Sequence, residues 1–357
     1  MSVMLDAEDV FALGPVAAVA AIRDALTAGL DPEGDVPRVI LPMAGGQGLL
    51  MPSETDGWFG VKVATVAPGN TARGLRRINA TYLLHDSETL TPVAIIDGVA
   101  LTTLRTPAVV VAACLNRLRA LAASSSDGLR LVVFGAGPQG EGHVRTIRAH
   151  VPVADVTVVT RHGGTSPSWA DRHLTADDAA VAGRVRSADV VVAATSAREP
   201  VVDGRLVRDS AVVLAVGSHE PTARELDGVL MRRATVVVEG LGVAFAEAGD
   251  VVLAVREGLL EPGALVTMAD LLGSGVAVRA DRPMVVKTSG MAWQDLVVAI
   301  AVYRQGGRRV RVPLPVISAA PDRSGDTSCG PGSARSADPG PQACSRPAWP
   351  RSTEPVS

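Results

Sequence analysis

The stretch Leu129-Arg-Leu-Val-Val-Phe-Gly-Ala-Gly-Pro-Gln-Gly-Glu-Gly-His-Val144 decides the class of fold. An apolar run leads directly into a G-x-G-x-x-G pattern, and a helical stretch follows it. The first glycine permits a tight turn, the second lets the backbone approach a pyrophosphate, and the third allows close packing of helix on strand. Free N–H groups at the helix N-terminus would then face the phosphates. The predicted cofactor contacts in this turn are Gly135, Gly137, Pro138, Gln139 and Gly140.

Four further Val-rich runs follow the turn, at residues 155–160, 189–195, 211–217 and 234–240. They are short, continuously apolar and separated by helical segments, which is typical of buried parallel strands in an α/β sheet. This context favours a nucleotide-binding turn over an ordinary Gly-rich turn. We therefore predict a Rossmann dinucleotide-binding domain with a parallel sheet over residues 127–289.

The residue that contacts the cofactor ribose is expected about 20 residues beyond the glycines. Thr160 and Arg161 occupy that place, and no carboxylate is present there. An acid would accept from the 2′-hydroxyl of NAD(H), whereas an arginine can bind the 2′-phosphate of NADP(H) bidentately. The pair predicts a preference for NADP(H), with NAD(H) possible. The alternative is that Arg161 is only a solvated loop residue.

A polar break near residue 126 separates this region from a first half of different pattern. A helix is predicted over 14–29, and a long apolar helix over 107–123. Thr106 is the predicted N-cap of that second helix, with Pro107 at its first position. Extended runs are predicted at residues 38–42, 49–51, 58–66, 78–85 and 92–96.

Three basic residues of the first half need an explanation. Lys62 lies in the middle of the strand 58–66, which contains no acid, and burying an unpaired charge is costly. Arg105 directly precedes the predicted cap. The positive end of a helix dipole does not favour a cation there, unless an anion lies between the helix end and the arginine. With Arg38 they predict a site for a substrate carboxylate, which arginine binds with its planar fork. Taken singly, each also fits an ordinary surface arginine or strand-edge lysine.

Over about residues 4–305 the chain resembles the ornithine cyclodeaminase and mu-crystallin family. Five segments carry the resemblance: "LLMPSETDGWFGVKVATVAPGN", "IIDGVALTTLRTPAVVVAA", "FGAGPQGEGHV", "VGSHEPTARELD" and "VVKTSGMAWQDLVVA". It implies a Rossmann domain inserted into a second, α+β domain that binds substrate and forms a homodimer. That domain would comprise residues 1–126, completed by about 290–317 and including a helix over about 290–305.

The resemblance also implies roles for individual residues. Lys62 matches the active-site lysine, and its charge is expected to be met by substrate and cofactor rather than by the fold. The residues that would hold the substrate are Arg38, Arg105 and Thr106. Those that would join the cofactor contacts are Thr195, Ser196 and Ser289.

The family's reactions pass through a 2-imino acid, and two departures bear on the choice among them. Leu49 and Leu50 stand where the cyclodeaminase pattern carries a carboxylate for the amino groups of ornithine. His219, beside Glu220, replaces a catalytic aspartate; it could act as an acid or base near neutral pH, or only pack on the cofactor. We predict reduction of a cyclic or linear 2-imino acid such as Δ1-pyrroline-2-carboxylate. The alternatives are ornithine cyclodeaminase and a non-catalytic NADP-dependent binding protein.

Composition limits the remaining possibilities. The chain has 357 residues and a net charge of -3, which does not suggest nucleic acid or an anionic membrane as a partner. The N-terminus has no basic n-region, and the three cysteines and six histidines show no metal-ligand spacing. A cytoplasmic protein with no metal is expected. Residues 318–357 are rich in Pro, Ser and Gly and are predicted to be a disordered tail.

Overall fold

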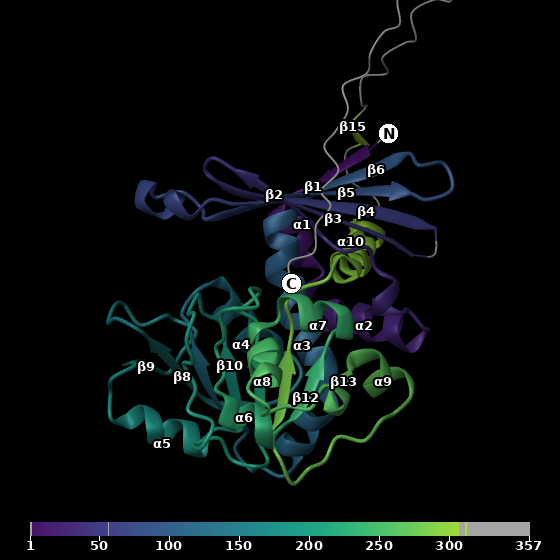
Figure 1. Cartoon of the computed structure of the whole chain (residues 1–357). Coiled ribbons are helices and arrows are strands. Elements are labelled where there is room, and N and C mark those ends of the chain that lie inside the picture. The colour runs from purple at the N-terminus through teal and green to yellow at the C-terminus, as the bar shows by residue number, and fades with distance from the viewer. Residues whose placement is uncertain (1, 56, 307–310, 313–357) are drawn as a thin grey trace, which may run out of the picture. The chain divides into compact units, whose positions relative to one another are not determined.

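The computed structural model describes residues 2–55, 57–306 and 311–312 (Figure 1). The predicted disordered tail over 318–357 lies outside the described residues. The described chain forms two sheets, and each is built mainly from one half of the sequence.

The first sheet has seven strands in the order β15-β1-β6-β5-β4-β3-β2. Strands β2 to β6 form an antiparallel meander, while β1 pairs parallel to β6. The predicted extended runs all become strands, although β3 is much longer than expected. The bounds are β1 Ser2–Leu5, β2 Val39–Met43, β3 Gly46–Thr55, β4 Trp58–Val66, β5 Ile78–Asp86, β6 Pro92–Asp97 and β15 Arg311–Val312.

Helices cover one face of this sheet (Figure 1). Strand β4 buries Gly60, Lys62 and Ala64 on that face, where α10 packs against β3, β4 and β5. Alternation along the strand therefore places Lys62 on the inner face with Gly60 and Ala64. Helices α1 Ala7–Ala12 and α10 Ala292–Gly306 pack directly on the sheet, and α2 Gly14–Thr27 packs on α10.

The second sheet has eight parallel strands in the order β13-β12-β14-β11-β10-β7-β8-β9. Strands β10, β11 and β14 are buried along their whole length, so the prediction of a buried parallel α/β sheet is confirmed. Chain order reverses between β7 and β10, and in open α/β sheets ligands bind outside the carboxyl ends of the strands at such a point. The strands are β7 Leu129–Phe134, β8 Val153–Thr160, β9 Arg172–Thr175, β10 Val190–Ala193, β11 Val212–Ala215, β12 Thr235–Val238, β13 Val266–Thr267 and β14 Met284–Lys287.

Six short helices accompany the second sheet. The first, α4, follows the Gly-rich turn, as the sequence predicts. Their bounds are α4 Pro138–Arg148, α5 Ala180–Ser187, α6 Gly228–Arg233, α7 Leu241–Glu247, α8 Gly249–Arg256 and α9 Met268–Gly273.

The predicted start of the long apolar helix is wrong. Helix α3 spans Gly98–Ala123, and its N-cap is Asp97, whose carboxylate accepts from the backbone N–H groups of Val99 and Ala100 at 2.9 Å each. Thr106 is therefore not a cap, and Pro107 lies inside the helix. The Asp97 cap fixes the start nine residues earlier, and an interior proline removes only one hydrogen bond of the helix. Arg105 consequently lies well away from the positive end of the helix dipole.

Helix α3 joins the two sheets. It packs against β5 of the first sheet and against β11 and β14 of the second. Its length and apolar composition would allow it to cross a membrane, but most of it is buried inside the fold, as in the core helix of a soluble protein. Residues 288–291 also pass from one sheet to the other, between the end of β14 and the start of α10.

Candidate active site

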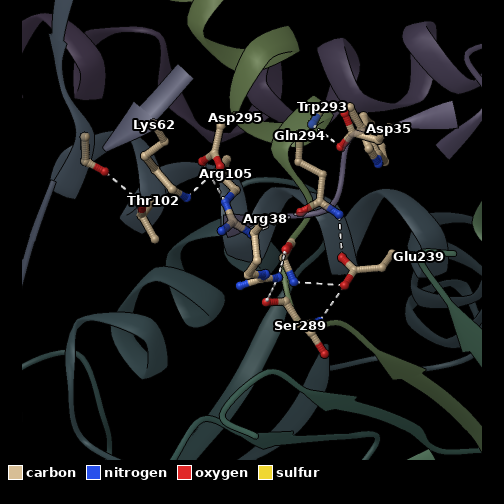
Figure 2. Close-up of polar contacts among 12 residues, drawn as sticks. Asp35, Arg38, Lys62, Thr102, Arg105, Glu239, Ser289, Trp293, Gln294 and Asp295 are labelled. Atoms are coloured by element: carbon tan, nitrogen blue, oxygen red, sulfur yellow. Dashed lines mark hydrogen bonds and ion pairs between the residues drawn. The ribbon is translucent and has the colours of Figure 1, made fainter. Parts of the chain in front are cut away.

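Lys62 is buried, and its ammonium is paired with a carboxylate of the fold. Its Nζ donates to Oδ2 of Asp295 at 2.6 Å, and Asp295 is completely buried in the first turn of α10 (Figure 2). The expectation that substrate and cofactor alone would meet this charge is therefore wrong. The partner lies 233 residues away along the chain. Strand pattern alone could not reveal that contact.

Arg105 shares the same carboxylate. Its Nε donates to Oδ1 of Asp295 at 3.0 Å, and its Nη1 donates to Oε1 of Gln294 at 3.0 Å. Gly290 has φ of +87°, and a Cβ there would lie 2.7 Å from Nη2 of Arg105. Glycine is therefore required at this position, because the backbone lies directly against the guanidinium. Within the described part of the chain, Nη2 of Arg105 makes no hydrogen bond.

The pKa shifts of Lys62 and Asp295 follow from their burial and from the carboxylate that Lys62 and Arg105 share. Burial lowers the pKa of Lys62 to about 8; Asp295 opposes the shift, and the charge of Arg105 adds to it. Burial alone would raise the pKa of Asp295, but the charges of Arg105 and Lys62 outweigh it and hold that pKa below its ordinary value. Asp295 is thus ionised, while Lys62 can gain or lose a proton close to physiological pH.

Arg38 reaches this cluster from the start of β2. Its Nη2 donates to the carbonyl oxygens of Ser289, at 3.3 Å, and Gly290 (Figure 2). The same nitrogen of Arg38 pairs with Oε2 of Glu247 at 2.8 Å. Its Nε and Nη1 have no partner among the residues that the structure describes. The charge of Arg38 also contributes to lowering the pKa of Lys62. The structure therefore brings together the three cations that the sequence singled out.

Glu239, at the end of β12, holds the segment between β14 and α10. Its Oε1 accepts from the backbone N–H groups of Ser289, at 2.6 Å, and Gly290, at 2.8 Å, and its Oε2 accepts from the side chain of Gln294 (Figure 2). Asp35 accepts from the backbone N–H of Trp293 at 2.9 Å. These contacts fix the position of Gly290 against Arg105.

The sequence reasoning did not single out Asp295, Gln294, Glu239 or Glu247. Asp295 carried a usable signal, since it is a lone acid in the apolar helix "AWQDLVVAIAV". An acid at such a buried position needs a partner. The other three gave no comparable signal.

The Gly-rich turn has the geometry that a pyrophosphate requires. Gly135 has φ of +106°, and a Cβ there would lie 2.4 Å from the carbonyl oxygen of Ala194. A Cβ on Gly140 would lie 2.2 Å from the carbonyl oxygen of Gly135, so turn and helix pack without room for a side chain. Gly137 caps α4 with open space beside it, and Pro138 begins the helix. The residues present therefore fit a dinucleotide.

The remaining predicted cofactor contacts lie around the same edge of the sheet. Gln139 donates to the carbonyl of Thr102 at 3.4 Å. Thr160 is the last residue of β8, and its hydroxyl donates to the carbonyl oxygen of His162 at 2.7 Å; Arg161 is exposed. Thr195 and Ser196 follow β10, and Ser196 is exposed.

His219 lies in the loop after β11, with its side chain exposed to solvent. Its pKa is lowered, chiefly because nearby protein atoms remove part of its hydration, and the charges of Arg38 and Lys287 add to the effect. It therefore faces the same region as Arg38.

Thr106, a predicted substrate contact, is buried in α3, and its side chain makes no hydrogen bond within the described ranges.

A cavity of about 270 Å³ lies beside Arg38. Its walls combine apolar side chains, among them Met51 and Met291, with the ion pair of Arg38 and Glu247. Gly290 also lines it and lies against Arg105, whereas Lys62, Arg105 and Asp295 are not among the lining residues.

Comparisons with known proteins agree with this arrangement. The chain is 30% identical over 274 residues to the ketimine reductase mu-crystallin of Mus musculus, covering 74% of this chain and 83% of the relative. It is 30% identical over 291 residues to a Δ1-pyrroline-2-carboxylate reductase of Bacillus cereus, covering 76% and 86%. Among solved structures, a probable ornithine cyclodeaminase of Bordetella pertussis superposes with a TM-score of 0.72 at 27% identity, covering 88% of this chain and all of that one. The ornithine cyclodeaminase/mu-crystallin family model matches residues 14–307, and the chain therefore belongs to that family.

Proposed function

We propose that this protein is an NAD(P)-dependent oxidoreductase that reduces a 2-imino acid to the corresponding amino acid. One observation carries the proposal. The buried cluster of Lys62, Arg105 and Asp295 holds two cations and a single anion, while the charge of Arg38 is balanced by Glu247. With Lys62 protonated the cluster has a net charge of +1, which one substrate carboxylate would neutralise.

The carboxylate would be held by the donor groups that the fold leaves unused. These are Nη2 of Arg105 and the Nε and Nη1 of Arg38, which can present a planar fork to two oxygens. The contacts to Asp295, Gln294 and the carbonyls of the 289–290 segment fix the other end of each guanidinium. Binding would therefore need little reorganisation of these side chains.

Lys62 is proposed to supply the proton. A bound nicotinamide dinucleotide would donate a hydride to the imine carbon. The imine nitrogen must gain a proton when the C=N bond becomes CH–NH, and an ammonium whose pKa is about 8 can release one at neutral to slightly basic pH. His219, in the loop after β11, is proposed to assist proton transfer to or from solvent.

The substrate is proposed to have an uncharged side chain or ring. Leu49 lies on the same face of the sheet as Met51 and Lys62, since it pairs with Ala64 and Met51 pairs with Lys62. An apolar residue there offers no acceptor for a second amino group. The names of the mouse and Bacillus relatives, both reductases of imines, support the same choice.

Ornithine cyclodeaminase remains the second candidate because Glu247 brings a carboxylate to the cavity beside Arg38. A carboxylate there could accept from a distal amino group if Arg38 turned toward the substrate. The match to the Bordetella protein supports this candidate as well.

We also propose that the cofactor is NADP(H), on the ground that Arg161 is exposed directly after Thr160 and no acid stands there. The two sheets are proposed to mark two domains, 1–126 completed by residues from about 290, and 127–289. A cytoplasmic location is proposed on composition alone.

A homodimer is proposed through the outer face of the first sheet. Register places Val39, Leu41, Met43 and Val63 on one face, and all four are exposed. Apolar side chains gathered in this way are typical of an interface, and a second copy would offer the same surface. In sedimentation, the wild type should be a dimer at micromolar concentration and Val63→Lys should weaken it. A monomeric wild type would refute the assembly.

The activity is tested by following NADPH oxidation with preformed cyclic imines and with 2-oxo acids plus ammonia or methylamine. Ornithine with NAD is assayed in parallel, by proline and ammonia formation. Turnover of at least one imine, with none of ornithine, is the expected result. Ornithine turnover without imine reduction would replace the proposal by the cyclodeaminase. Binding of NADPH without either activity would favour a binding protein.

A further inference from the structure

A second group of buried charges lies at the carboxyl edge of the parallel sheet. Lys287 ends β14, Asp250 lies in α8, and Glu225 lies between β11 and α6; each is at most 1% exposed. Nothing in the proposed reaction uses these three residues. Buried charges are costly unless they are paired and hydrogen-bonded, so their contacts indicate what they do.

Lys287 is bound to the loop that carries His219. Its Nζ donates to the carbonyl oxygen of Ser218 at 2.5 Å and pairs with Oδ2 of Asp250 at 3.2 Å. Lys287 is the register partner of Ala215, the last residue of β11. The lysine therefore fixes the backbone of the residue directly before His219.

Glu225 ties two loops together. Its Oε1 accepts from the backbone N–H and from the hydroxyl of Thr195, at 2.7 Å each, and its Oε2 accepts from the backbone N–H of Gly217 at 2.6 Å. A Cβ on Gly217 would lie 2.1 Å from the carbonyl oxygen of Thr195, so the two loops also pack directly. Asp250 in turn accepts from the N–H groups of Glu225 and Leu226 at 2.8 Å each, which fixes the backbone of Glu225.

These contacts bind the two loops that follow β10 and β11. The loops after β10 and β11 stand at the carboxyl ends of their strands, and β10 borders the point where the strand order reverses. If the network served only to stabilise the sheet, well-packed apolar side chains would do so without the cost of desolvating three charges. Directed hydrogen bonds have a further effect, since they set the orientation of the backbone groups that they bind.

We propose that Lys287, Asp250 and Glu225 are positioning residues for the nicotinamide side of the active site. Glu225 holds Thr195 and Gly217 in place for the cofactor, and Lys287 holds Ser218 so that His219 is directed toward the substrate. This inference rests on the proposed function, because it gives His219 a part in proton transfer. The groups that face His219 are Arg38, Glu220 and Lys287, and the loss of Lys287 would raise the pKa of the imidazole.

The test removes the ion pair of Lys287 and Asp250 with a double substitution. Lys287→Met/Asp250→Asn removes both charges of the ion pair, and the Asn oxygen can still accept from Glu225 and Leu226. Glu225 loses the nearby cation but keeps its hydrogen bonds to Thr195 and Gly217. The matched control is Arg208→Met/Asp189→Asn, which removes an ion pair at the opposite, amino end of the same sheet. Both are compared with wild type for kcat, KM and the pH dependence of kcat. His219 is also titrated by NMR in each protein.

The expected result separates the two variants. Lys287→Met/Asp250→Asn should lower kcat by about 10²-fold, the scale of a small misplacement of reacting groups, with KM for the imino acid little changed. The His219 titration should move to higher pH. The control should keep the wild-type kcat and His219 titration even if its melting temperature falls.

Equal kinetic losses in both variants, or a wild-type titration of His219 in the test variant, would overturn the inference. If the double variant does not fold, Glu225→Gln provides the same comparison with smaller disturbance; the inference then requires a loss of kcat that Asp189→Asn does not share. The NMR titration needs no turnover. If His219 shifts as expected but the wild type reduces no imine, the proposed function fails while the positioning of the loop stands.

Discussion

Two buried lysines, Lys62 and Lys287, each pair with a buried aspartate, and the surroundings of the two pairs differ in charge. Lys62 shares Asp295 with Arg105, so two cations face one anion. Lys287 pairs with Asp250 and lies near Glu225, so one cation faces two anions. The contrast teaches that a buried lysine is not identified as catalytic by its burial. The excess of positive charge around Lys62 is what suits that site to an anionic substrate.

The donors and acceptors of the two clusters differ in the same way. Both oxygens of Glu225 accept from backbone N–H groups, and Lys287 has two protein partners. Lys62 has one partner, and Nη2 of Arg105 has none within the described residues. The charges of the Lys287 cluster are thus paired by the fold, whereas the Lys62 cluster retains donors for a ligand.

The largest expected effect comes from Lys62→Met. Turnover should fall by about 10²–10⁴-fold, as for loss of a general acid. Because Asp295 would keep only Arg105 as a charged partner, the melting temperature should fall too. Lys62→Arg keeps a cation against Asp295 but does not release its proton near neutral pH, so it should retain stability without retaining turnover. If Lys62→Arg keeps activity along with stability, Lys62 acts only as a structural cation, and the contrast with Lys287 disappears.

The next effect distinguishes the two arginines. Arg38→Gln and Arg105→Gln should each raise KM for the imino acid roughly 10–100-fold, the scale of a lost charged hydrogen bond. Only Arg105→Gln should also lower the melting temperature, because Arg105 is needed by the buried Asp295 and Arg38 is partly exposed. Thermal unfolding and substrate titrations check both. An unchanged KM in either variant would remove that arginine from the carboxylate site.

The pH dependence should follow the depressed pKa of Lys62. The protonated form is lost as pH rises through about 8, so kcat/KM should fall there. In Asp295→Asn the carboxylate that raises the pKa of Lys62 is gone, so the fall in kcat/KM should move to lower pH. In the control Asp189→Asn the fall in kcat/KM should stay at the wild-type pH. The free energy of unfolding should rise with pH, whereas kcat/KM falls. Between about 8 and the ordinary lysine value the unfolded chain binds more protons, so Lys62 contributes a rise in stability with pH.

The smallest effect concerns the cofactor. Arg161→Ala should weaken NADPH binding by about 10-fold, corresponding to the loss of one partly solvated phosphate contact, and leave NADH binding unchanged. Fluorescence titration with both cofactors checks it, with the exposed Arg198→Ala as a control. Equal or tighter binding of NADH by the wild type would contradict the preference.

The sequence supported prediction of much of the fold, because the evidence for it is local. The run 129–144 carries strand, turn and helix in contiguous residues, and β4 begins and ends where alternation predicted. Helix α3 was misjudged because two local signals compete. Thr106-Pro107 resembles a helix start, yet Asp97 is the cap that the chain uses.

The site was only partly predictable, for a physical reason. Lys62 stands out as a charge in an apolar strand with no local acid. Arg105 was singled out by a helix start that the structure places at Gly98 instead, and Arg38 only in combination with these two. Their partners Asp295 and Glu247 come from elements far along the chain, and tertiary packing alone brings them close. Sequence patterns describe the period of one element and not which helix covers which strand. The excess of positive charge was visible in the sequence, but the carboxylates that limit it were not.

The eight residues 288–295 link the cofactor side to the substrate side. Ser289 and Gly290 bind Glu239 of the parallel sheet, while Asp295 binds Lys62 of the other. If the cofactor contacts Ser289, as the sequence predicts, it should also act on the backbone of Gly290 against Arg105. In thermodynamic terms we expect the dinucleotide and the substrate to be coupled, and such coupling is reciprocal: by whatever factor the first ligand tightens binding of the second, the second tightens binding of the first.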